Sequence, residues 1–378
     1  MDSLRSAVKD VHWLRGRDSE FEDRTTEESL CALIACLQFH RSALSGCEDT
    51  VTLQYGSRDT YVAGGALSGC EDTVTLQYGS RDTYVAGLGD IVNRPVLTLE
   101  NEFARDMKWR DHKGVEYSLR GEWAYVTGVA VPRDGCTAGR RDSANGGKTP
   151  TTFLDEANDF IRRRRSTLPT EPSEAIRQLL PDACAYLTLE EVLSVRLYSG
   201  PAYQPINVFL RQVSSLSGAQ RRSQVQDTSS TFAATVGHLV SAIRKLAAVA
   251  TREEASGPLY RGVRGELPST FWQRDDAGMV CATDAAFMST SRNRGTPIHY
   301  MGGDDNVLWE LEPCEEPTDS AYHCGADISL LSQFSAEQEV LYPPCTLLLV
   351  RGRSDAPPPP VVEGGKKFVP IAAQPSFV

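Results

Sequence analysis

The order of helical and strand patterns in the C-terminal half of this 378-residue chain does most to limit its fold. Stretches with helical spacing come first, beginning near Thr188, Tyr203 and Phe232. Short strand patterns follow at 259–263, 286–291, 306–311, 338–342 and 346–350. Helices that precede strands, instead of alternating with them, predict an α+β fold rather than a parallel α/β sheet. We therefore expect an α+β domain within residues 181–352.

Local signals support the helices of this domain. Thr188 and Glu191 have the spacing of a capping box, in which the two side chains satisfy the first turn of a helix. The Gly200–Pro201 pair then ends that helix. The third helix carries an apolar stripe from Phe232 to Leu246. Between the second and third helices, residues 214–230 are polar and are expected to form a loop.

An internal repeat dominates the N-terminal half. Residues 43–64 recur unchanged as residues 66–87, with Gly65 between the copies. Apolar and polar residues alternate around Val51 and Tyr55, which predicts short strands. The unit resembles a degenerate MORN repeat, a short β-hairpin module. A duplication that merely lengthens a β-rich region is an equally good interpretation, because solenoids generally need three or more units.

These patterns divide the chain. We expect an N-terminal segment (1–42), a β-rich region with the repeat (43–135), a linker with a basic helix (136–180), the α+β domain (181–352) and a disordered Pro-rich tail (353–378).

Aromatic residues and a basic run stand out in the second and third of these parts. The β-rich region is expected to bury Trp109, Tyr117, Trp123 and Tyr125. The helix predicted at 153–166 ends in the run Arg162 to Arg165, which is typical of a solvated face. A nuclear-import signal or a site for an anionic surface is the alternative for that run.

Composition excludes several classes of protein. The formal net charge of −11 argues against a general nucleic-acid binder. Ten cysteines without a CxxC pair predict neither a zinc site nor a disulfide framework, so we expect no metal. No run approaches the length of a membrane span, and residues 1–16 lack the apolar core of a signal peptide. An intracellular, cytoplasmic location is therefore expected.

The candidate chemistry lies in the strand-rich segment. Neither a GxGxxG nor a GxxxxGK[ST] loop is present, so a Rossmann or P-loop site is not indicated. What remains is Arg261 on a short apolar strand, the Ser289–Ser291 cluster, and Glu337 and Glu339 entering another strand. Carboxylates at i and i+2 share one face of a strand, although Glu337 could still belong to the preceding loop.

Paired carboxylates suit a reaction that develops positive charge. Glycosyl transfer passes through an oxocarbenium-like state that one carboxylate can stabilise. A second carboxylate could hold a guanidinium acceptor by charged hydrogen bonds. Arg261 could pair with a pyrophosphate, and Ser289 could hydrogen-bond Glu339 or a ribose hydroxyl.

Taken together, residues 187–350 resemble the Arg-Ser-Glu class of arginine-specific mono-ADP-ribosyltransferases, which carry an Arg, a Ser-Thr-Ser and a Glu-x-Glu motif in this order. Further matching text is Leu197-Tyr198-Ser199-Gly200, Tyr203, Ile206-Asn207, Leu210-Arg211, Asp327-Ile328-Ser329, Ser332 and Val340-Leu341-Tyr342-Pro343-Pro344. The resemblance implies a split antiparallel β core preceded by helices, and NAD as co-substrate without a metal.

The resemblance also implies roles for individual residues. The NAD-binding set would be Arg261, Gly262, Ser289, Thr290, Ser291 and Glu339. Glu339 would bind the ribose 2′-hydroxyl and stabilise the oxocarbenium ion, while Glu337 would bind and activate the acceptor guanidinium. The catalytic set would therefore be Glu339, Glu337, Ser289 and Arg261. The loop on the nicotinamide side would map onto 292–303, where Arg292 and Arg294 add charge that could serve phosphate.

The expected function is transfer of ADP-ribose from NAD to arginine side chains of proteins, with the chain itself as one candidate acceptor. An NAD glycohydrolase on the same scaffold would use water instead of arginine. A repeat-containing scaffold with a weak catalytic domain is a third interpretation. The sequence names no acceptor protein and does not separate NAD from NADP.

Overall fold

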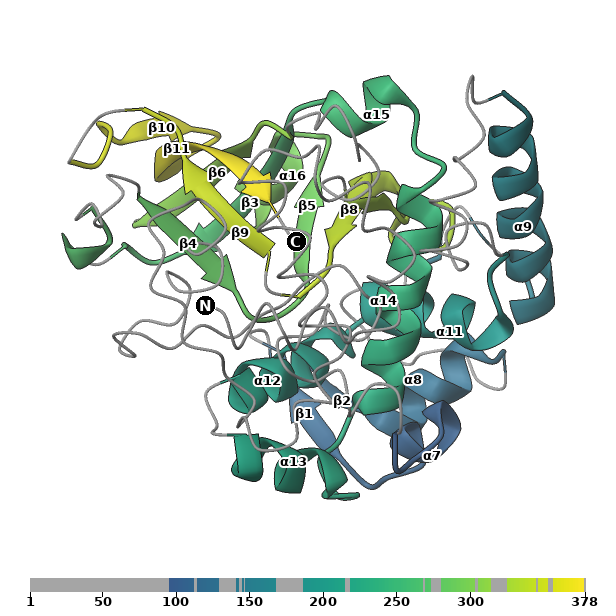
Figure 1. Cartoon of the computed structure of the whole chain (residues 1–378). Coiled ribbons are helices and arrows are strands. Elements are labelled where there is room, and N and C mark those ends of the chain that lie inside the picture. Colours follow the sequence, from purple (N-terminus) through teal and green to yellow (C-terminus); the bar gives the residue numbers. More distant parts are fainter. Residues whose placement is uncertain are drawn as a thin grey trace, which may run out of the picture.

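The computed structural model describes residues 95–111, 114–128, 141–142, 145, 147–167, 186–214, 218–267, 269–272, 280–302, 305–313, 325–344, 346–352 and 356–376. The N-terminal segment and both copies of the tandem repeat, 43–64 and 66–87, lie outside these residues. In the described part, helices gather on one side of a curled sheet (Figure 1). No helix there is long and apolar enough to cross a membrane.

The helices fall into two groups along the chain. Before the expected catalytic segment lie α7 (Leu99–Phe103), α8 (Leu119–Val126) and α9 (Pro150–Thr167). Within it lie α11 (Leu189–Ser199), α12 (Tyr203–Ser214), α13 (Gly218–Gln226), α14 (Ala233–Ala247), α15 (Arg252–Ser256) and α16 (Gly295–Tyr300). Two short 3-10 helices span Ser269–Trp272 and Ser335–Glu337.

The strands form a small hairpin and one large sheet. The hairpin pairs β1 (Lys108–Arg110) with β2 (Glu116–Ser118). The sheet contains β3 (Leu259–Arg264), β4 (Cys281–Asp284), β5 (Met288–Ser291), β6 (Asn306–Leu311), β7 (Ala326–Asp327), β8 (Glu339–Tyr342), β9 (Thr346–Val350), β10 (Val361–Glu363) and β11 (Lys366–Ser376). Its order is β4-β9-β11-β6-β3-β5-β8-β7, with β10 paired to β11.

The sheet divides between β3 and β5. These strands share only the register pair Tyr260↔Ser291, whereas β3 pairs with β6 along its full length. Every strand pair is antiparallel except β11 with β6. The expected α+β fold with a split antiparallel core is therefore confirmed, and the split brings Arg261 of β3 to the edge of β5.

The helix predicted from Thr188 is anchored at its first turn and in the core. Thr188 and Glu191 form the expected capping box. Glu191 also accepts hydrogen bonds from Lys245 at 2.7 and 2.9 Å and from Ser241 at 2.5 Å, both on α14. Because Glu191 is almost fully buried, these partners are what makes its charge tolerable in the core.

The prediction of a disordered tail at 353–378 is wrong. Strand β11 lies between β9 and β6, and its Phe368, Ile371 and Ala373 are buried. Prolines at 370 and 375 weaken the strand signal in the sequence. In the structure β11 pairs with β6 over 369–373 and with β9 over 373–376, so each proline has one side without a paired strand.

The predicted β-rich character of 88–135 is also wrong for the residues that the structure describes. Only β1 and β2 are strands there, and Trp109 stacks on Tyr117 across them with ring centroids 6.0 Å apart. Trp123 lies on α8 and stacks on Phe103 of α7. Aromatic residues favour strands only where they pack on a sheet, and Trp123 packs between two helices.

Two further boundaries differ from the sequence expectation. The polar stretch 214–230 contains helix α13, which its polar composition concealed. The catalytic domain does not begin at residue 181, because buried residues of α7, α8 and α9 belong to one continuous core with α11, α14 and the sheet. The predicted helix at 153–166 is confirmed as α9.

Candidate active site

The structure brings Arg261, Ser289 and Glu339 together at the split in the sheet. Strands β5 and β8 are neighbours, with Ser289 opposite Leu341 and Ser291 opposite Glu339. Ser289 and Glu339 are therefore diagonal neighbours on one face, and the Ser289 side chain hydrogen-bonds the Glu339 carboxylate. Arg261 Nη1 donates to the carbonyl oxygen of Ser289 at 3.0 Å.

Glu339 is a buried carboxylate with a raised pKa. Only 7% of the residue is exposed, and burial raises its pKa to about 7. The hydrogen bond from Ser289 and the charge of Arg261 lower that pKa, while the charges of Glu337 and Asp327 raise it. Such a group changes charge near neutral pH and responds to small changes around it.

Glu337 does not share the strand with Glu339. It ends the 3-10 helix Ser335–Glu337, and Gln338 then adopts a left-handed conformation with φ 49° before β8 begins. The alternative in which Glu337 lies in the preceding loop therefore holds. The two carboxylates still lie close enough for the charge of Glu337 to raise the pKa of Glu339.

The Glu337 carboxylate has a defined partner. Its Oε1 accepts a hydrogen bond from the Tyr300 hydroxyl at 2.6 Å. Burial raises the pKa of Glu337, while this hydrogen bond and the nearby His299 lower it. Tyr300 and His299 lie within the predicted loop at 292–303, but nothing in the sequence singled them out, because no local pattern links α16 to the Glu-x-Glu segment.

Three other residues of the expected NAD-binding set have structural partners. Thr290 is buried and its Oγ1 donates to the carbonyl oxygen of Val340 at 2.6 Å. The Ser291 hydroxyl donates to the carbonyl oxygen of Glu337, also at 2.6 Å. A Cβ on Gly262 would lie 2.9 Å from the carbonyl oxygen of Pro297, so glycine allows α16 to approach β3.

The segment expected to form the loop on the nicotinamide side contains helix α16. Its arginines are already paired: Arg292 with Asp327 at 3.3 Å, and Arg294 with Glu310 and Glu363. Asn293 caps its own turn by accepting from the Gly295 N–H at 2.9 Å. The charge of this segment therefore fixes the segment to the domain rather than standing ready for phosphate.

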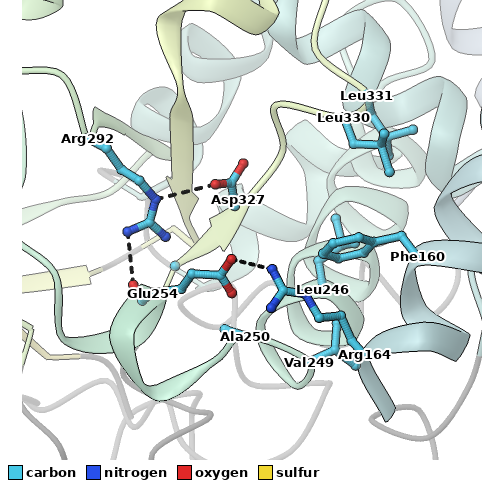
Figure 2. Close-up of a pocket in the computed structure, with 11 residues that line it drawn as sticks. Phe160, Arg164, Leu246, Val249, Ala250, Glu254, Arg292, Asp327, Leu330 and Leu331 are labelled. Carbon is cyan, nitrogen blue, oxygen red and sulfur yellow. Dashed lines mark hydrogen bonds and ion pairs between the residues drawn. The ribbon is translucent and has the colours of Figure 1, made fainter. Parts of the chain in front are cut away.

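A pocket lies beside this site, between α9, the end of α14, α15 and β7. Figure 2 shows two ion pairs across it, Arg164 with Glu254 and Arg292 with Asp327, joined by a hydrogen bond from Arg292 to the backbone carbonyl oxygen of Glu254. Its floor is apolar and includes Phe160. None of Arg261, Ser289 and Glu339 lines it. Since Arg292 follows Ser291 directly, the contacts tie α9 to the end of β5.

The lead-in to the Glu-x-Glu segment is held by residues far away in sequence. Asp142 N–H donates to the carbonyl oxygen of Gln333 at 2.6 Å, and the Asn145 amide donates to that of Ser332 at 3.2 Å. Buried Arg141 pairs with Glu122 and hydrogen-bonds the Gln333 side chain. The segment expected to be a linker thus positions the loop that carries Glu337.

The motif around Tyr198 joins the helices to the site. Its hydroxyl donates to the carbonyl oxygen of Phe287, just before β5, at 3.3 Å. The Asn207 amide donates to the same hydroxyl at 3.1 Å.

Among the residues that the structure describes, no three His, Cys, Asp or Glu side chains are grouped to hold a metal ion.

Comparisons with known proteins give a family and a set of similar folds. Residues 177–369 match the family model described as ADP-ribosyltransferase exoenzyme. No curated protein sequence matches the chain. Among solved structures, the ADP-ribosyltransferase HopU1 of Pseudomonas syringae pv. Tomato DC3000 is similar at 18% identity, with a TM-score of 0.38 over 67% of this chain and 96% of that one.

Two further structures have a similar arrangement. The ADP-ribosyltransferase Vis, a toxin from Vibrio splendidus solved in complex with agmatine, is 20% identical over 55% of this chain and 87% of its own, with a TM-score of 0.33. The eukaryotic mono-ADP-ribosyltransferase ART2.2 is 14% identical over 60% of this chain and 79% of its own, with a TM-score of 0.32.

Proposed function

Because the chain belongs to the ADP-ribosyltransferase exoenzyme family and uses NAD, we propose that it transfers ADP-ribose to arginine side chains of proteins. The position of Glu337 is the observation that supports arginine as the acceptor. Its carboxylate lies beside buried Glu339 and is half-buried at the end of a tight turn. A carboxylate in that place can hold a guanidinium next to the bond that breaks.

The first half of the proposed reaction uses Arg261, Ser289 and Glu339. Arg261 pairs with the NAD pyrophosphate, for which a guanidinium has suitable donors. The bond between nicotinamide and ribose C1 breaks, and nicotinamide leaves as a neutral molecule with the bonding electron pair. The ionised Glu339 carboxylate stabilises the positive charge that develops on the ribose. Ser289 fixes that carboxylate through its hydrogen bond.

The second half uses Glu337. A guanidinium nitrogen of the acceptor forms a new bond to ribose C1, and its surplus proton passes through the Glu337 carboxylate to water. Glu337 therefore needs to be ionised and accessible from solvent. The hydrogen bond from Tyr300 favours the ionised form, and the residue is partly exposed.

Hydrolysis of NAD is the competing outcome, because water can replace the arginine at the same ribose carbon. It needs Arg261, Ser289 and Glu339 but no residue that binds a guanidinium. The two functions therefore differ in their dependence on Glu337.

The test is NAD turnover with agmatine, a small guanidinium compound, followed by separation of ADP-ribosyl-agmatine from free ADP-ribose. The wild type should form the agmatine product. Glu337→Gln should lose at least about tenfold of that product while nicotinamide release persists. Glu266→Gln, which changes an exposed carboxylate after β3, serves as the matched control.

A wild-type protein that releases only free ADP-ribose in the presence of agmatine would contradict the arginine acceptor and favour the glycohydrolase. Intact-mass measurement of the protein incubated with NAD tests the chain itself as an acceptor. Each transferred ADP-ribose would add one mass increment, and fragmentation of the modified peptides that places this increment on an arginine side chain would assign the acceptor.

A further inference from the structure

Helix α16 contacts the carboxylate of Glu337. The Tyr300 hydroxyl donates to Glu337 Oε1 at 2.6 Å, across 37 positions of sequence. Tyr300 is 49% exposed, so its ring borders solvent at the same place. Within the described residues, the Glu337 carboxylate has no other hydrogen-bond partner. The second oxygen of the carboxylate and the remaining lone pairs of the first can therefore accept from a ligand.

Both partners of this contact are held independently of each other. The carbonyl oxygen of Tyr300 accepts from Arg264 Nε at 3.1 Å and from Arg264 Nη2 at 2.8 Å. On the other side, the Ser291 hydroxyl fixes the carbonyl oxygen of Glu337. The backbones on the two sides of the contact are therefore held by separate hydrogen bonds, so both side chains start from fixed positions.

A glycine allows α16 to lie close to the sheet. Gly262 of β3 faces Pro297 of α16 so closely that a side chain would not fit. Ile298 and Met301 pack with Leu308 and Phe368 in a small apolar cluster below the helix, with Tyr260 against it. The helix that carries Tyr300 is thus part of the packed domain.

The surroundings of Glu337 suit a flat cation. The titratable groups that face it are His299 and Tyr300 from α16 and Glu339 from β8. The His299 and Tyr300 rings are in edge contact, with centroids 5.3 Å apart. A guanidinium is planar, binds carboxylates through paired N–H groups and stacks on aromatic faces. An exposed tyrosine ring beside a carboxylate offers both kinds of contact.

We infer that Tyr300 is the positioning residue for the acceptor guanidinium: its hydroxyl orients Glu337, and its ring borders the place where the guanidinium lies. The inference rests on the proposed arginine acceptor. It assigns acceptor selection to α16 together with the Glu-x-Glu turn. The role assigned to Tyr300 is orientation through the hydrogen bond that its hydroxyl donates to Glu337, without proton transfer.

Tyr300→Phe is the main test, because it removes the hydroxyl and keeps the ring. Loss of one charge-assisted hydrogen bond should lower kcat for agmatine transfer about tenfold at pH 7. The acidic limb of the transfer profile should move to higher pH, since the hydrogen bond lowers the pKa of Glu337. Nicotinamide release without agmatine should stay within about twofold of wild type.

Two variants complete the design. Tyr300→Leu removes the ring as well, and should raise KM for agmatine beyond any effect of Tyr300→Phe. Tyr186→Phe makes the same change at a tyrosine of similar exposure, 45%, outside the site, and should leave all parameters unchanged. If Tyr300→Phe matches wild type in kcat and pH profile while wild type transfers to agmatine, the inference is wrong. If wild type forms no agmatine product, both the inference and the proposed acceptor fail.

Discussion

The Ser289 side chain hydrogen-bonds the Glu339 carboxylate from the neighbouring strand, and this contact stabilises a charge that burial otherwise opposes. Burial raises the pKa of Glu339 to about 7, and the hydrogen bond restrains the increase. The register of β5 and β8 sets the contact, because the two residues lie diagonally on one face. Glu339, the proposed catalytic carboxylate, would therefore change charge near the pH at which it would act.

The turnover of NAD should depend on pH. Only ionised Glu339 stabilises the developing cation, so kcat/KM for NAD should rise about tenfold per pH unit below pH 7 and level off above it. Glu337→Gln should move this rise in kcat/KM, the acidic limb of the pH profile, to lower pH, since the charge of Glu337 raises the pKa of Glu339. A profile of nicotinamide release against pH measures both. A flat profile between pH 5 and 8 would refute the assignment.

Removal of the Ser289 hydroxyl should shift the pH profile of nicotinamide release in the direction opposite to the shift expected for Glu337→Gln. In Ser289→Ala, the pKa of Glu339 should rise further, so the limb moves to higher pH. The rate on the plateau should also fall on the order of tenfold, because the carboxylate loses its orientation. Ser223→Ala, at an exposed position of α13, is the control. Equal pH limbs in Ser289→Ala and wild type would show that the contact does not tune Glu339.

Buried Glu102, on α7, should contribute strongly to the stability of the folded protein. Glu102 of α7 is fully buried and accepts from the N–H groups of Ala234 and Thr235 at 2.8 and 2.9 Å, and from the Thr235 hydroxyl at 2.6 Å. It caps α14, whose N-cap residue Phe232 makes no side-chain cap. Glu102→Ala leaves these donors buried without an acceptor.

That change should lower the free energy of unfolding by about 3 kcal/mol, measured by chemical denaturation. Glu100→Ala, at an exposed position of the same helix, should change it by less than about 0.5 kcal/mol. Similar losses for the two variants would mean that the cap contributes little.

The family-matched segment should not fold alone. A fragment of residues 177–369 lacks α7, α8, α9 and the end of β11, all of which contribute to the common core. It also lacks Arg141 and Asn145, which hold the segment before Glu337. A fragment of residues 95–378 should unfold cooperatively on heating, and the shorter one should not. Matching transitions would show that the N-terminal helices are dispensable.

The sequence predicted those parts of the molecule whose signals are local. The capping box of Thr188 and Glu191 and the apolar stripe of α14 each depend on residues within a few turns. The family resemblance of Arg261, Ser289 and Glu339 indicated that these residues belong together, and the structure brings them together, while their catalytic roles stay a prediction.

The missed features depend on partners far apart in sequence. The strand character of β11 depends on β6 and β9 on its two sides, and Pro370 argues against it locally. Trp123 packs against Phe103 between helices, where its strand preference has no influence. Tyr300 meets Glu337 only because α16 folds onto β3 at Gly262. None of these contacts has a signal in the local pattern.

Product analysis of NAD turnover by wild type and Glu339→Gln, with and without agmatine, tests the central claim most directly. Glutamine keeps the shape of the side chain and removes its charge. The account predicts that wild type forms ADP-ribosyl-agmatine and nicotinamide, and that Glu339→Gln loses at least about a hundredfold in both nicotinamide release and transfer. A Glu339→Gln protein that releases nicotinamide at the wild-type rate would contradict it.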